Sequence, residues 1–190
     1  MRKLILLLVS CLWAISLQAQ EHLKFKGVPI DGTLQEFVQK MKAKGFTSVG
    51  MQCGIAVLKG DFAGAKECTI GVGTLQGNNL VSKISVAFPE ASNWLELYGR
   101  YCDLKEMLTE KYGSPSNCIE EFQRSYQPQD DADRFYEAKS DRCKFITTFS
   151  PSTGDIELRI AHGDYKCFVI LSYFDGYNSY IVRKKAMDDL

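Results

Sequence analysis

Hydrophobic residues recur at helical spacing in two segments of the chain, and each segment begins after a residue type that caps helices. The first follows Thr33 and ends at Gly45, and the second follows Ser92 or Asn93 and ends at Gly113. Spacings of three and four residues place the apolar side chains of each segment on one face. These positions are Leu34, Phe37, Val38 and Met41 in the first segment, and Leu97, Tyr101, Leu104, Leu108 and Tyr112 in the second.

Between and after these helices the apolar pattern changes to alternation, which is typical of half-buried strands. Residues 46–88 alternate with glycines between the runs, and three further strands are expected at 143–149, 155–161 and 166–174. The last of these is apolar on both faces around Val169 and Ile170, so it should lie near the centre of the sheet. A short helix from about Asn178 ends the chain.

The element order predicts an α+β fold, with a helix followed by antiparallel strands in each of two loosely repeated halves and a short C-terminal helix. The halves cover roughly 20–90 and 91–190 of a single domain. The polar stretch 116–141 is expected to be a loop around a short helix near Arg134 to Lys139.

The first 19 residues have the organisation of a secretory signal peptide. Arg2 and Lys3 precede an apolar segment, 4–17, and Ala19 is the small residue at the expected cut. That segment is shorter than the roughly 20 residues that span a bilayer, so no transmembrane segment is expected in the mature chain. The protein is therefore predicted to be periplasmic or secreted. An alternative is a lipoprotein anchored through Cys11, since Leu8-Val9-Ser10-Cys11 is similar to a lipobox.

Charge excludes some classes of partner. The chain has 23 Lys and Arg against 23 Asp and Glu, with 45% hydrophobic residues. A chain without excess positive charge has no field to hold a phosphate backbone, so no nucleic acid partner is expected. The motifs of serine hydrolases, zinc proteases and P-loop nucleotide sites do not occur in the sequence, and no cofactor is predicted.

Removal of the predicted signal peptide would take away Cys11 and leave six cysteines, an even number. An oxidising compartment and an even count favour a disulfide framework, of which 15 pairings are possible. A hairpin turn at Gly60-Asp61 would place Cys53 opposite Cys68. A metal site is not expected, because no Cys-x-x-Cys occurs and His22 and His162 are far apart. The six cysteines are Cys53, Cys68, Cys102, Cys118, Cys143 and Cys167.

Three other groups of residues are candidates for chemistry. His162 and Cys167 could be neighbours on a hairpin, which would suit a thiol-dependent enzyme, although a bonded structural cysteine is the favoured interpretation. The glycines of Gly71-Val72-Gly73 lie in a strand pattern and indicate a bulge or a close approach of another element. The aspartates at 130, 131 and 133 indicate a solvated acidic loop, since the remaining calcium ligands are absent.

Aromatic residues near the C-terminus suggest binding. Exposed aromatic side chains beside a strand end suit recognition of a protein or of a sugar ring. Most of the series 165–180 should be core, and Tyr177 and Tyr180 are the candidates for an exposed ligand-binding pair.

One phrase of the sequence resembles a known family. The segment from Leu104 to Pro115, a helix ending in Tyr112-Gly113-Ser114-Pro115 before strands, resembles the helix-and-sheet module of β-lactamase-inhibitor-protein-like folds. The resemblance implies a protein-binding surface on a sheet, and no inhibitory loop is matched. The opening, 25–33, is similar to that of uncharacterised small exported proteins of anaerobic gut bacteria.

The expected function is a non-enzymatic exported binding module that uses a sheet face or the loops beside it to hold a protein or glycan. The alternatives are a small hydrolase or thiol-dependent enzyme around His162, and an accessory subunit of an envelope assembly.

Overall fold

The computed structural model describes residues 21–75, 79–123 and 127–188. The proposed signal peptide, 1–19, and Cys11 lie outside these ranges. In the described ranges no helix is long and apolar enough to cross a membrane. The helices are α2 (Leu34–Ala43), α3 (Trp94–Tyr112), α4 (Asp131–Lys139) and α5 (Gly176–Asp188). The strands are β1 (Lys24–Phe25), β2 (Val28–Pro29), β3 (Thr47–Gln52), β4 (Ile55–Phe62), β5 (Ala65–Thr74), β6 (Val81–Ala87), β7 (Asn117–Phe122), β8 (Cys143–Phe149), β9 (Gly154–Gly163) and β10 (Lys166–Asp175).

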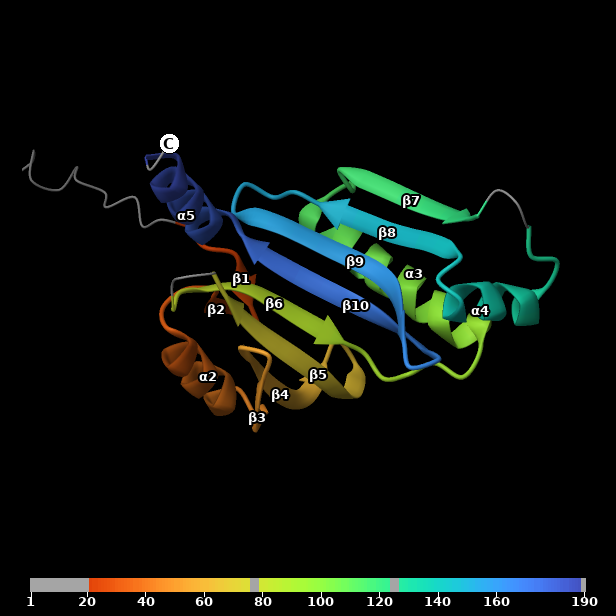
Figure 1. Ribbon diagram of the computed structural model, residues 1–190, viewed down its shortest axis with the longest axis horizontal. Coiled ribbons are helices and arrows are strands. Elements are labelled where there is room, and N and C mark those ends of the chain that lie inside the picture. Colours follow the sequence, from red (N-terminus) through yellow and green to blue (C-terminus); the bar gives the residue numbers. More distant parts are fainter. Residues whose placement is uncertain (1–20, 76–78, 124–126, 189–190) are drawn as a thin grey trace, which may run out of the picture.

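Eight strands form one antiparallel sheet in the order β3-β4-β5-β6-β10-β9-β8-β7, which confirms the predicted α+β class (Figure 1). Each half of the chain contributes a helix followed by a meander of four strands. The two meanders meet where β6 pairs with β10, with Val86 opposite Leu171. The last strand of each half therefore lies in the middle of the sheet, as the apolar pattern of β10 predicted.

Helix α2 begins where the capping residue predicted. The hydroxyl of Thr33 accepts a hydrogen bond from the Glu36 backbone N–H, and the Glu36 carboxylate accepts one from the Thr33 N–H in return. This reciprocal capping box satisfies two backbone donors at the start of the helix. Phe37 and Met41 then point into the core.

Helix α3 also follows its predicted cap. The Asn93 side chain accepts a hydrogen bond from the Glu96 N–H, and the helix ends at Gly113, which has a positive φ of 84°. Such a conformation favours glycine because a Cβ atom would be crowded. The buried stripe of α3 comprises Trp94, Leu97, Tyr101, Leu104 and Leu108.

The predicted loop at 116–141 is wrong in its first part. Residues Asn117–Phe122 form the edge strand β7, which pairs with β8 from Asn117↔Thr148 to Phe122↔Cys143. An edge strand has one partner and little burial, so it lacks the apolar alternation on which the prediction depended. Helix α4 begins at Asp131, three residues earlier than expected, because Asp130 caps it.

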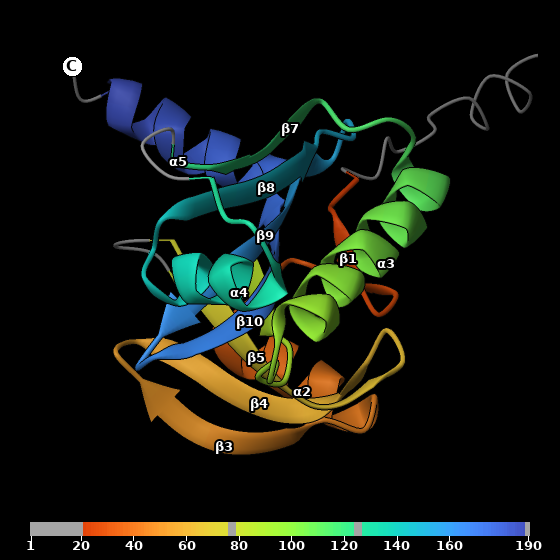
Figure 2. The ribbon, with the colours of Figure 1, turned by 90° about the vertical axis from the view of Figure 1, so that its right-hand side faces the viewer.

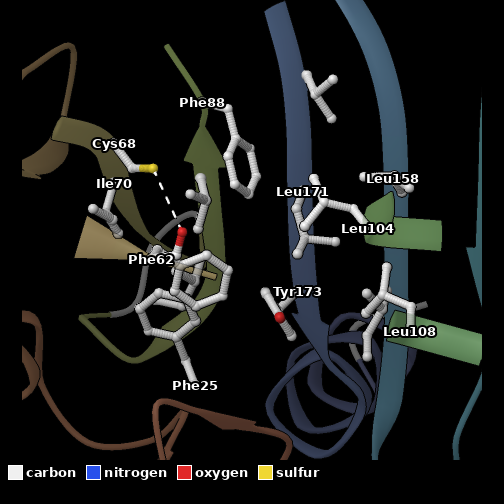
Figure 3. Close-up of a cluster of buried hydrophobic side chains, with 14 of the residues drawn as sticks. Phe25, Phe62, Cys68, Ile70, Phe88, Leu104, Leu108, Leu158, Leu171 and Tyr173 are labelled. Atoms are coloured by element: carbon white, nitrogen blue, oxygen red, sulfur yellow. Dashed lines mark hydrogen bonds between the residues drawn. The ribbon is translucent and has the colours of Figure 1, made fainter. Parts of the chain in front are cut away.

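The helices α2, α3 and α4 pack against one face of the sheet, and Figure 2 shows α3 and α5 on opposite sides of it. Buried side chains from both halves fill that face in a single cluster (Figure 3). Phe25, from the N-terminal hairpin, stacks on Phe62 at 5.0 Å and meets Tyr173 of β10 edge-on at 5.5 Å. The N-terminal hairpin is thus part of the core that joins the halves.

Candidate functional site

The two tyrosines proposed for binding lie on α5 and differ in exposure. Tyr180 is 61% exposed, whereas Tyr177 is half-buried with its ring edge-on to His22 at 5.1 Å. The expected exposure is therefore found for Tyr180 alone. Tyr177 contacts an N-terminal residue across the fold, so its first role is to hold that segment against α5.

A buried polar network beside Tyr177 was missed by the sequence analysis. Asp175, at the end of β10, is fully buried and accepts hydrogen bonds from the backbone N–H groups of Leu23 and Asn178 at 2.9 Å each. His22 Nδ1 lies 3.1 Å from the same carboxylate. Asn178 donates in turn to the carbonyl of Val81 at 2.8 Å. Asp175 thus caps α5 and ties it to the N-terminal segment. The one sign of this role in the sequence is the Asp175-Gly176 pair that follows a strand.

The predicted pairing of Cys53 with Cys68 is wrong. The hairpin of β4 and β5 turns at Ala63 and Gly64, beyond the expected turn at Gly60-Asp61, so Cys68 lies opposite Gly60. Cys53 is in the turn before β4, next to the end of the hairpin where Ala56 pairs with Val72. At about 3.4 Å per residue along a strand, the two cysteines are well beyond bridging distance.

The other cysteines are distributed over the sheet and α3. The structure forms no disulfide among the six cysteines of the described part of the chain. The disulfide framework stays a prediction. Cys68 and Cys167 are fully buried, and Cys102 and Cys143 are partly buried. Cys53 and Cys118 are exposed.

The structure brings His162 and Cys167 side by side, as the thiol-enzyme hypothesis requires, but it does not lower the pKa of the cysteine thiol. His162 pairs with Cys167 across β9 and β10, but its Nε2 lies 3.1 Å from a carboxylate oxygen of Asp141. Burial raises the pKa of Cys167, and burial together with the nearby Cys167 raises the pKa of Cys143 to about 12. A catalytic thiol needs a lowered pKa, because the thiolate is the nucleophile. These shifts have the opposite sign.

The acidic and glycine motifs have structural roles. Asp130 accepts a hydrogen bond from the Asp133 N–H as the cap of α4, and Asp131 pairs with Arg134 at 2.6 Å. Gly71 lies within β5, and a Cβ atom there would meet Ile55 at 3.3 Å, which is the close approach that the sequence indicated. In the part of the chain that the structure describes, no group of three or more His, Cys, Asp or Glu residues is placed to hold a metal ion.

The face of the sheet opposite α2, α3 and α4 carries the candidate site, and we call it the open face. Alternation along each strand shows its position, because Ile70, Val86 and Leu171 are at most 1% exposed while the residues beside them are mostly half-buried. Two rows of cross-strand neighbours cross its centre. The first row is Val57, Gly71, Ser85, Ser172, Glu157 and Thr148, and the second is Lys59, Thr69, Ala87, Ile170, Arg159 and Ile146.

Small side chains form the middle of the open face. Gly71, Ser85 and Ala87 lie on the adjacent strands β5 and β6, and Ser85 Oγ is 3.0 Å from Ser172 Oγ on β10. These side chains fill little space above the strands, and they are half-buried, while Ser172 is only 3% exposed.

Larger side chains surround the small residues in the middle of the open face. Phe168 and Phe174 lie near the two ends of β10 and are half-buried, and Lys83 Nζ is 4.8 Å from the ring centroid of Phe174. Arg159 and Glu157 approach to 3.8 Å on β9. An apolar and small-residue centre with a charged rim is the anatomy of a protein-binding surface.

Comparisons with known proteins do not assign this chain to a family. No family model matches it, and neither the curated proteins nor the solved structures contain a significant match.

Proposed function

We propose that this protein is an exported, non-enzymatic binding module that holds a protein partner on the open face of its sheet. The observation that carries the proposal is the composition of this face. With α2, α3 and α4 on one face, the other face of the eight-stranded sheet has only α5 on its side, where that helix contacts β6, β9 and β10. An antiparallel sheet commonly leaves one face to solvent, so the open face becomes a candidate binding surface through its composition, with Ala87 and Ile170 at its centre and charged residues such as Arg159 around them.

The chemistry of the open face favours a protein over a small molecule. Small-molecule sites are concave and bury most of their ligand, whereas the middle of the open face is formed by the small residues Gly71, Ser85 and Ala87. Strands with small residues let a partner approach the backbone closely, and Phe168 and Phe174 offer aromatic anchors at the two ends of β10.

The test is a pair of charged substitutions of equal sign. Ala87→Arg places a long cation in the centre of the open face, and Met107→Arg places one on the outer surface of α3, where Met107 is 45% exposed. Burying an unpaired charge in an interface costs several kcal/mol. We expect partners cross-linked to the protein in its own envelope to be retained by the Met107 variant and reduced at least ~10-fold in the Ala87 variant.

A photo-cross-linking amino acid at Ile170 should mark the same partner directly, and one at Met107 should not. If partner recovery is equal for the two arginine variants, or if cross-links form from α3 and not from β10, the open face is not the binding surface.

A further inference from the structure

We propose that the edge strand β3 pairs with β3 of a second copy of this chain, so that two sheets join into one across a two-fold axis. This inference does not depend on what the open face binds. The edge has three properties that together select this occupant: a strand that is exposed and paired on one side only, an absence of charged residues within that strand, and a bulge that an identical strand can match.

Strand β3 is the exposed outer strand of the sheet at its β4 side. All six of its residues are exposed, and Val49 and Met51 are 59% and 61% exposed. An edge strand carries a row of backbone N–H and C=O groups without sheet partners, which is a template for another strand. Met51 points over a groove of about 340 Å³ between β3 and α2, where Leu34 and Val38 line the opposite wall.

Strand β3 itself carries no charge. None of its residues, Thr47–Gln52, is charged, and the groove between β3 and α2 is lined only by uncharged residues, whereas a second hollow beside Thr47 and Val49 has charged residues such as Lys44 and Lys59 in its lining. In a chain with 24% charged residues, this depletion matches the composition found at the centre of an interface. Natural edge strands are protected against pairing by charged side chains, Pro, bulges or short length, and β3 has a bulge but no charged side chain.

The other edge of the sheet has that protection. Strand β7 carries Glu120 and Glu121, and the Glu120 carboxylate pairs with Lys105 at 2.6 Å. Pairing of two β7 strands would bring like charges together, whereas two β3 strands bring none.

A bulge in β3 distinguishes a second copy from an unrelated strand. The register against β4 shifts between Ser48 and Gly50, so Val49 is an extra residue in β3. A regular strand pairing with this edge would lose register on one side of the bulge. In a two-fold pair with its axis between Val49 and Gly50, the two bulges face each other, and Ser48 of each copy lies opposite Met51 of the other on the same face of the sheet.

The joined sheet would place α2 of both copies on one side, because a two-fold axis perpendicular to the sheet keeps each face on its own side. The two open faces would then lie side by side on the other, which would give the assembly two equivalent surfaces.

The first test measures mass in solution with light scattering after size exclusion. The wild-type protein should have twice the mass of the chain at tens of micromolar. Met51→Lys puts a charge on the edge and should shift the dimer dissociation constant at least ~10-fold higher. Ile119→Lys makes the same kind of change on the β7 edge and should leave the mass unchanged. Circular dichroism checks that both variants are folded.

The second test detects the register itself. With the axis between Val49 and Gly50, the two Val49 residues are diagonal neighbours across it, with Cα atoms roughly 6 Å apart, which a disulfide can bridge. In a background with Cys53→Ser, Val49→Cys should form an interchain disulfide on mild oxidation, and Ile119→Cys should not. A wild-type protein that is monomeric at all concentrations, a dimer that survives Met51→Lys, or a Val49→Cys variant that does not cross-link would overturn the proposal.

Discussion

At the scale of single residues, the cysteines illustrate how position changes chemistry. Cys118 is exposed on β7, and its Sγ lies 3.3 Å from Lys105 Nζ and 3.5 Å from Thr147 Oγ1. Cys68 is buried, and desolvation raises its pKa. The Cys118 thiol is thus accessible to solvent, whereas the Cys68 thiol is buried and harder to deprotonate.

The structure predicts an order of reactivity among these thiols. In the native protein, iodoacetamide should label Cys53 and Cys118 at least ~10-fold faster than Cys68, Cys143 and Cys167, because labelling needs an accessible thiolate. Time-resolved labelling followed by peptide mass spectrometry measures the rates. Denaturation without reductant should equalise them. Thiols that stay blocked after denaturation would instead support the disulfide framework.

Sequence reasoning found the residues that begin and end elements more reliably than the contacts between them. Thr33 and Asn93 cap their helices as their types predicted. The role of Asp175 as a tie between segments could not be recognised, because two of its partners, Leu23 and His22, are more than 150 residues away in sequence. The Cys53 and Cys68 pairing failed for a related reason, since a turn shifted by three residues changes which residues face each other.

At the scale of elements, α4 is closed by an ion pair with the residue that leads into β8. The Glu137 carboxylate accepts two hydrogen bonds from the Arg142 guanidinium, at 2.8 and 2.6 Å, and its side chain is 4% exposed. These bonds hold the pKa of Glu137 below its ordinary value of 4.5. The pair fixes the direction in which the chain leaves the helix and enters the sheet.

This pair should make stability depend on acid. Because the pKa of Glu137 is lower in the folded protein, its contribution is complete well above pH 4.5 and is lost as the pH falls through the folded value. Glu137→Gln should lower the melting temperature at pH 7 and flatten its decline below pH 4.5. Glu110→Gln, on the exposed surface of α3, should do neither. Equal acid profiles for the wild-type protein and the Glu137 variant would contradict this assignment.

Edge strands limited the prediction of elements. The central strands β6, β9 and β10 alternate clearly because one face of each is buried. Strand β7 has no fully buried residue, so its sequence looks like a polar loop. Periodicity reports burial, and an element that buries little gives little signal.

At the scale of the molecule, the network around Asp175 joins the two ends of the described chain. Residues from the N-terminal segment, β6 and α5 all reach it, through Leu23, Val81 and Asn178. The carboxylate is fully buried, so its partners have no water to replace it.

Loss of this carboxylate should destabilise the whole fold. Asp175→Ala leaves the N–H groups of Leu23 and Asn178 without their acceptor, at a cost of about 2–4 kcal/mol in the free energy of unfolding. Asp155→Ala, an exposed carboxylate on β9, should cost less than about 0.5 kcal/mol. Urea denaturation measures both. If the two variants are equally stable, the network is not a structural tie.

The fold class and the two-half organisation followed from the order of helices and strands, whereas the open face could not be predicted from the order alone. Periodicity separates the faces of each strand, but the side on which α2 and α3 pack depends on the direction of their connections. The residues of the open face, such as Ser85 and Ala87, have no distinctive type. They become a candidate site only because the register places them side by side.

The position of β10 constrains when the molecule can form. This strand is the last of the sheet to be synthesised, yet it lies between β6 and β9 and connects the two halves. Until it emerges, β6 and β9 each have an unpaired edge and the two meanders have no common sheet, so a growing polypeptide cannot complete its core. A chain truncated before β10 would therefore have two separate meanders in place of one continuous sheet.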